Sequence, residues 1–114
     1  MPDAAADLLP GTLELLVLKA LSLTPMHGWG IPQRIDQFSG EVFRVQQGSL
    51  YPALQRMLRR GWVRSEWRIT EHNRRARYYL ITAAGRRQLE SETVNWKRTS
   101  AAVNEILRVR LADL

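Results

Sequence analysis

The spacing of apolar residues changes at Gly61, and this change constrains the fold more than any other feature of the sequence. From Gln46 to Arg60 the apolar side chains recur at helical intervals, and the opposite face is polar and basic. Gly61 is the kind of residue that commonly follows a helix end. From Trp62 to Ile69, apolar and charged residues then alternate as in a β-strand. The sequence therefore predicts a short amphipathic helix followed at once by a strand.

A second strand is predicted from residue 76 to 81, after a polar turn over residues 70–75. The two strands form a β-hairpin whose tip carries Arg74 and Arg75. A hairpin of two strands is only marginally stable in water, so we expect it to lean on the helices. The residues expected to make this contact are Val63, Trp67, Tyr78 and Leu80.

Two further helices are predicted before this segment, over residues 12–21 and 29–38. The first has leucines on two opposite faces, so we expect one face to serve the core and the other a second copy of the protein. The connection between them contains His27. This histidine has no partner of the kind that a nucleophile and base require, so we expect it to anchor the loop to backbone.

The last predicted helix runs from residue 83 to 114, a stretch without proline. If helical throughout, it would be about 45 Å long, more than so small a domain can cover. Its side chains repeat at intervals of seven and form a coiled-coil-like seam, from which we infer a homodimer. The residues expected at the dimer interface are Leu15, Leu18, Leu89, Trp96, Val103 and Leu107.

Positive charge is concentrated in one region. The chain has 17 Lys and Arg against 11 Asp and Glu, but residues 56–77 alone contain eight arginines and only two acids. Such a region indicates a polyanionic partner, nucleic acid first and a membrane surface second. An acidic protein partner is an alternative, and so is a merely solvated basic face on an ordinary surface helix.

Other classes of function find no support in the sequence. The chain has no cysteine, and its two histidines stand far apart, so we expect no metal site and no cofactor. No apolar run approaches the roughly 18 residues that a membrane span needs. No nucleophile motif, paired carboxylates or phosphate-binding loop indicates an enzyme. We expect a cytoplasmic protein that does not contact membranes.

The order of elements is helix, helix, a short strand over residues 41–45, helix, strand, basic turn, strand and long helix. This order is that of a winged helix-turn-helix followed by a dimerisation helix, a fold that is mainly α with a small β-hairpin. We therefore expect a flexible tail over residues 1–10, a DNA-binding domain over residues 11–82, and a C-terminal dimerisation helix over residues 83–114.

Five motifs in this order carry a resemblance to a known family. They are the leucine-rich segment Leu13–Leu21, His27-Gly28-Trp29, Gly48-Ser49-Leu50-Tyr51-Pro52-Ala53-Leu54, Gly61-Trp62-Val63, and Arg74–Thr82 followed by Ala84-Gly85. Together they resemble the PadR-type transcriptional regulators over roughly residues 12–89. The single short C-terminal helix is similar to that of the smaller subfamily. The resemblance implies a homodimer, most often a repressor, that binds a pseudo-palindromic operator in double-stranded DNA.

Two positions depart from the family pattern. Trp29 stands where the family usually has tyrosine, and Gln46-Gln47 replace a stronger helix cap. The helix therefore begins at Ser49, or the two glutamines have another role such as contact with DNA.

Candidate DNA-binding residues lie on the predicted recognition helix and on the hairpin. We expect Gln55 to read adenine and Arg56 or Arg59 to read guanine, while the hairpin tip holds phosphate or enters the minor groove. For Tyr51 the alternative is a structural position under the hairpin. The full set is Gln46, Gln47, Ser49, Tyr51, Gln55, Arg56, Arg59, His72, Asn73, Arg74, Arg75 and Arg77.

Trp96 has two interpretations. The resemblance implies that an aromatic residue on the last helix can line a flat cavity at the dimer centre and bind a small planar effector, such as a drug or a phenolic compound. The other interpretation is that Trp96 simply fills the dimer seam, and it is the one we favour.

Overall fold

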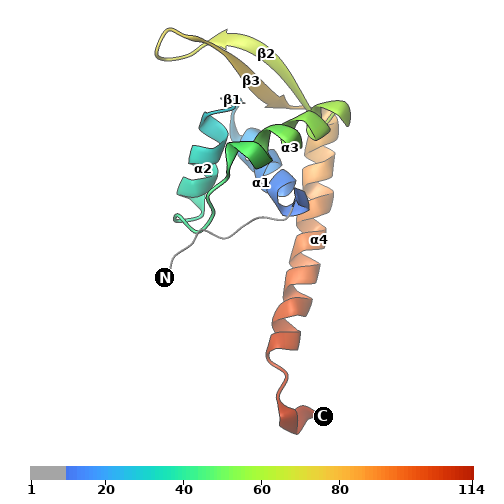
Figure 1. Ribbon diagram of the computed structural model, residues 1–114. Helices are drawn as coiled ribbons and strands as arrows, with labels where there is room; N and C mark the ends of the chain where they lie inside the picture. Colours follow the sequence, from blue (N-terminus) through green and yellow to red (C-terminus); the bar gives the residue numbers. More distant parts are fainter. Residues whose placement is uncertain (1–9) are drawn as a thin grey trace.

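A computed structural model describes residues 10–114, and the predicted tail lies outside this part of the chain except for Pro10. Four α-helices, three strands and a terminal 3₁₀ turn follow one another (Figure 1). In chain order they are α1 (Pro10–Leu23), β1 (Met26–His27), α2 (Gly30–Phe38), α3 (Gln47–Arg59), β2 (Val63–Ile69), β3 (Arg75–Ile81), α4 (Ala83–Leu107) and η1 (Leu111–Asp113). The predicted fold class, mainly α with a small β-hairpin, is confirmed.

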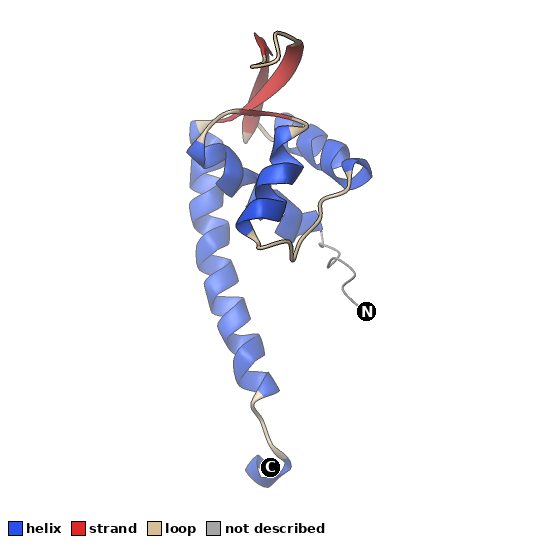
Figure 2. Cartoon of the chain, turned by 90° about the vertical axis from the view of Figure 1, so that its left-hand side faces the viewer, coloured by secondary structure: helices blue, strands red, loops and turns tan. Residues whose placement is uncertain are grey.

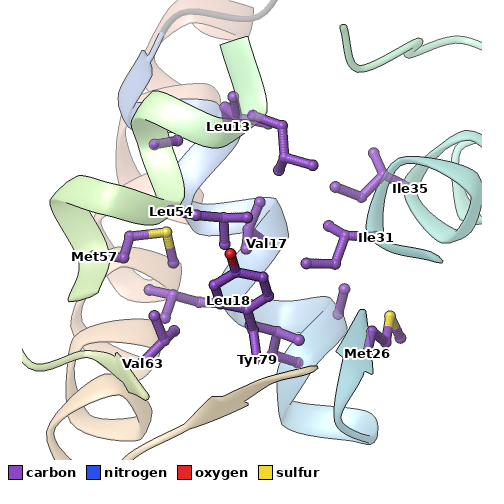
Figure 3. Close-up of a cluster of buried hydrophobic side chains, with 14 residues drawn as sticks. Leu13, Val17, Leu18, Met26, Ile31, Ile35, Leu54, Met57, Val63 and Tyr79 are labelled. Atoms are coloured by element: carbon purple, nitrogen blue, oxygen red, sulfur yellow. The ribbon is translucent and has the colours of Figure 1, made fainter. Parts of the chain in front are cut away.

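α1 lies at the centre of the helical body and contacts α2, α3, α4 and β3. Its residues Val17 and Leu18 are completely buried and meet Ile31 of α2 and Leu54 of α3 (Figure 3). α1 needs apolar side chains on more than one face because elements of its own subunit surround it. This explains its leucine-rich sequence without recourse to a second copy.

The sheet has three antiparallel strands in the order β1-β3-β2. The two hairpin strands were predicted, but the short strand predicted over residues 41–45 is wrong, because that segment has only an isolated β-bridge at Phe43 and the third strand is β1. β1 pairs Met26 with Tyr79 and His27 with Tyr78. A strand of two residues is too short to show an alternating pattern, so the sequence predicts only a connection between the first two helices there. Its pairing attaches the start of α2 to the hairpin.

The hairpin turns a different face of β3 to the core than the sequence predicted. Tyr79 is buried, while Tyr78 and Leu80 are only partly covered. Burial raises the pKa of the Tyr79 hydroxyl above its usual value. Four consecutive apolar residues end this strand, so alternation could not identify the inward face. Since side chains alternate along a strand, an error of one position exchanges the two faces.

Trp67 is a second correction on the hairpin. It was predicted to lean on the helices, but it is 56% exposed because β2 and β3 extend beyond the helical body (Figure 1). Only Val63, at the start of β2, reaches the core.

α4 begins where the sequence predicted and ends earlier. The side chain of Thr82 caps the helix by accepting a hydrogen bond from the backbone N–H of Gly85 at 3.0 Å. The helix ends at Leu107 and not at residue 114, so it is about 37 Å long. Its first turns lie against the body, and the remainder extends away from it (Figure 2).

Two residues predicted at a dimer interface belong to the core of their own subunit. Leu18 has no exposed surface, and Leu89 packs against the core cluster. Neither prediction distinguished a side chain that meets a second copy from one that meets another element of the same chain. Along the outer part of α4, the apolar residues exposed to solvent are Val94, Trp96, Val103, Ile106 and Leu107.

Candidate nucleic-acid interface

The solvent-facing side of α3 carries Tyr51, Gln55 and Arg59, which stand four residues apart and therefore share one face of the helix. Leu50, Ala53, Leu54 and Met57 hold the opposite face in the core. All three solvent-facing residues are exposed, as are Gln46, Gln47 and Ser49 at the start of the helix. α3 begins at Gln47, not at Ser49, and Gln46 makes no capping bond with its side chain. The side chains of both glutamines are thus free to contact another molecule.

Arg56 lies on a different side of α3, in a partly buried ionic cluster. Its Nε donates to Oε1 of Glu14 at 2.8 Å, and Nη1 of Arg60 lies 3.3 Å from Oε2 of the same carboxylate. Glu14 is only 5% exposed, so this contact ties α3 to α1. The ion pair argues against the predicted role of Arg56 in reading guanine, because its guanidinium is directed at α1.

Glu14 was missed as a residue that positions the recognition helix. The signal was available in the sequence, since Glu14 is the only acid in an otherwise apolar stretch between Leu13 and Leu18. A buried carboxylate needs a positive partner. The sequence could not say which of the many arginines supplies it.

Tyr51 is both partly packed and partly exposed. Its ring lies so close to Gly28 that a Cβ at that position would come within 3.0 Å of the hydroxyl oxygen. Beside it, Nδ1 of His27 accepts a hydrogen bond from the backbone N–H of Gly30 at 3.2 Å, which confirms the predicted anchor. The His-Gly and Leu-Tyr-Pro motifs therefore meet in space. Tyr51 remains 41% exposed and can still contact a ligand.

The two faces of the hairpin differ in charge. On the face away from the core, Glu66 forms ion pairs with Arg64 and Arg68. The pKa of Glu66 is lowered, first by the hydrogen bond from Arg68 and then by the positive charges of Arg68 and Arg64. On the face that carries Tyr79, Arg75 and Arg77 stack over Trp67, at 4.8 and 5.9 Å from the ring centre. No acid pairs with these two arginines among residues 10–114.

The turn at the tip is organised by Thr70. The hydroxyl of Thr70 accepts hydrogen bonds from the backbone N–H groups of His72 and Arg74, at 3.3 and 3.2 Å. Asn73 adopts a positive φ of 58°, which asparagine tolerates better than most residues. His72, Asn73 and Arg74 all remain exposed at the tip.

The ion pairs divide the eight clustered arginines into two equal groups. Arg56, Arg60, Arg64 and Arg68 are paired with carboxylates. In the part of the chain that the structure describes, the four without an acidic partner are Arg59, Arg74, Arg75 and Arg77. The unpaired charge therefore lies on the exposed side of α3 and on the wing, the hairpin formed by β2 and β3.

Comparison with known proteins agrees with this arrangement. A model of the transcriptional regulator PadR-like family matches residues 17–91, well over half of the chain. The chain belongs to the PadR-like family of transcriptional regulators. PadR-like regulators bind DNA and are not enzymes, as the sequence predicted.

One curated relative and two solved structures are similar to this chain. A 37.1 kDa protein in a transposon of Streptomyces fradiae is 40% identical over 81% of this chain, which spans only 25% of that relative's length. A PadR-like transcriptional regulator from Bacillus cereus superposes with a TM-score of 0.76 and 27% identity, covering 88% of this chain and 95% of the other. A PadR family regulator from Eggerthella lenta gives a TM-score of 0.75 and 26% identity, with coverage of 88% and 85%.

This PadR-like chain has a hollow between the N-terminal end of α1 and the middle of α4. Its volume is about 310 Å³, and Leu15, Glu92, Asn95 and Trp96 are among the residues that line it. Trp96 is 50% exposed. Burial raises the pKa of Glu92, and its Oε2 has no hydrogen-bond partner in the described residues.

Residues 10–114 of this PadR-like chain include no helix with both the length and the apolar character of a bilayer span.

Proposed function

We propose that two copies of this PadR-like regulator bind a pseudo-palindromic operator in double-stranded DNA and repress transcription by occupying a promoter. The observation that carries this proposal is the unpaired positive charge of Arg59, Arg74, Arg75 and Arg77 beside the exposed face of α3. Phosphate provides the counter-charge that these side chains lack within residues 10–114.

In this proposal α3 enters the major groove and the wing reaches the adjacent groove. Gln55 is placed to read adenine and Arg59, in place of Arg56, to read guanine, because both are exposed on the same face of α3. Arg74, Arg75 and Arg77 hold phosphate or enter the minor groove, with His72 and Asn73 beside them. Gln46, Gln47, Ser49 and Tyr51 contribute from the start of the helix.

Residues 11–82 serve as the DNA-binding domain and residues 83–114 as the dimerisation segment. Trp96, Val103 and Leu107 support this division, since they follow one side of α4 and are at least half exposed. Exposed apolar stripes on an extended helix are typical of a surface that a second helix covers. A two-fold dimer presents two α3 helices, which matches a palindrome.

The salt dependence of DNA binding tests the proposal. For a duplex from upstream of the protein's own gene, log Kd plotted against log salt concentration should be steep. Arg75→Ala should reduce the slope of this plot by about one. Arg64→Ala is the matched control, because Arg64 already pairs with Glu66 at 3.4 Å on the other face of the same hairpin. The slope measured for Arg64→Ala should equal that of the unmodified protein.

The same titration, followed by sedimentation, should give two chains per duplex. Equal affinity for the upstream duplex and for random DNA would exclude the proposed function as a sequence-specific regulator. A complex with one chain per duplex would exclude the dimer. Capture of an acidic protein without any DNA binding would favour the protein-interaction alternative.

A second function is supported by the hollow beside Trp96, namely the sensing of a small planar aromatic effector. An exposed indole at the rim of a hollow offers a stacking surface for a planar ring. In a dimer, the partner's helix would close the open side. Effector binding at this place would change the spacing of the two α3 helices and so the affinity for DNA.

Tryptophan fluorescence tests the second function. Titration with an acridine dye or a hydroxycinnamate should quench the emission, and Trp96→Ala should remove most of this quenching. Val94→Ala serves as the control, because Val94 is an exposed apolar residue on another side of α4. Quenching that survives Trp96→Ala would mean that no effector binds at this indole.

A further inference from the structure

Trp29 is a large aromatic residue that is mostly exposed to solvent. It stands at the start of α2, forms no capping bond, and is 70% exposed. Its indole N–H has no acceptor among residues 10–114. An exposed tryptophan with a free N–H combines an apolar surface with a hydrogen-bond donor, and both can serve a partner.

Two hollows flank Trp29. One, of about 580 Å³, lies toward the wing and is lined by His72, Arg74 and Arg75 among others. The other, of about 170 Å³, lies toward α3 and is lined by Tyr51, Arg75 and Arg77 among others. Trp29 thus stands between the recognition helix and the wing.

The residues around both hollows select for a negatively charged occupant. Their linings include arginines and no carboxylate, although Glu71 lies in the nearby turn. Arg75 lines both hollows and has no acidic partner in the described residues. An occupant that spans both sides of Trp29 must therefore be anionic along its length and apolar where it meets the indole.

We propose that Trp29 packs against the sugar-phosphate backbone of double-stranded DNA, on the strand that separates the groove entered by α3 from the groove reached by the wing. This inference rests on the DNA-binding function proposed above. The strand offers phosphates to Arg75 and Arg77 and the apolar face of a deoxyribose to the indole. Because the contact is to the backbone, Trp29 adds affinity without reading bases.

Binding of Trp29→Ala tests the assignment on two probes, a duplex selected by the unmodified protein and a random-sequence duplex. The variant should bind each of them about tenfold more weakly. Trp29→Phe should recover most of this loss, since it keeps an aromatic surface. Phe38→Ala is the matched control, because Phe38 is an exposed aromatic residue at the opposite end of α2 and lines neither hollow.

Trp29 carries no charge, so the slope of log Kd against log salt should be unchanged in Trp29→Ala, unlike in Arg75→Ala. Thermal unfolding should match that of the unmodified protein, since the side chain is mostly exposed. A loss confined to the selected duplex would overturn the backbone assignment, and so would full binding by Trp29→Ala. If the unmodified protein binds neither duplex, the proposed function itself fails.

Discussion

Replacing both Arg56 and Arg60 with methionine is expected to lower the free energy of unfolding by about 3 kcal/mol. The two arginines pair with Glu14, whose side chain is 6% exposed. Without them, a carboxylate would remain buried between α1 and α3 with no positive partner. The measurement is urea unfolding near neutral pH, followed by circular dichroism.

The control for this experiment also removes the carboxylate of Glu14, which the double variant leaves without a positive partner. Adding Glu14→Met to the double variant should restore at least half of the lost stability, because three apolar side chains that pack together can replace a buried ion cluster. Arg64→Met with Arg68→Met, which breaks the exposed pairs with Glu66, should cost far less, because exposed ion pairs contribute little to stability. Equal losses from the two double variants would contradict the role assigned to Glu14.

Replacing Gly85 with alanine is expected to lower the free energy of unfolding by about 3 kcal/mol, although alanine favours a helix interior by about 1 kcal/mol. A Cβ at this buried position would overlap the backbone carbonyl oxygen of Trp62 and come within 2.8 Å of Cγ1 of Ile81. The carbonyl of Trp62 cannot easily move, because it accepts a hydrogen bond from the backbone N–H of Thr82 at 3.0 Å. Thermal and urea unfolding measure the loss.

Gly48→Ala is the matched control for Gly85→Ala. Gly48 also lies in a helix, but a Cβ there would meet nothing within 4 Å. Its replacement should leave stability unchanged or raise it by up to about 1 kcal/mol. A Gly85→Ala protein as stable as the unmodified one would show that the start of α4 can shift away from Trp62.

Both positions connect stability with the proposed function. Glu14 holds α3 against α1, and Gly85 allows α4 to leave the body directly beside the base of the wing. In a dimer joined through α4, these two contacts would set the distance and the angle between the two recognition helices. Variants that fold but loosen either contact should therefore bind the operator less tightly.

The helices, the hairpin and the basic segment could be predicted from the sequence because their signals are local. Helical spacing of leucines, the glycine at position 61, the cap at Thr82 and the polar turn around Asn73 each act within a few residues. The same is true of the motifs that indicated the PadR-like family.

What the sequence could not predict depends on contacts between distant residues. β1 exists only because Met26 pairs with Tyr79, and the inward face of β3 is the one whose Tyr79 packs in the core beside α1. Leu18 and Leu89 were predicted as dimer contacts, yet Leu18 is fully buried within its own subunit and Leu89 packs partly buried against the same core.

The sequence by itself determined the order of the helices, the position of the hairpin, the family and the arginine-rich region, because periodicity, caps and motifs depend on neighbouring residues. Only the tertiary structure decided which arginines are free. Glu14 and Arg56 are 42 residues apart in the chain, and folding brings their charged groups within 2.8 Å. Pairing directs Arg56 toward α1, because a charge buried on folding must be satisfied by whichever opposite charge the fold brings to it. Of the eight clustered arginines, Arg59, Arg74, Arg75 and Arg77 have no acidic partner in residues 10–114.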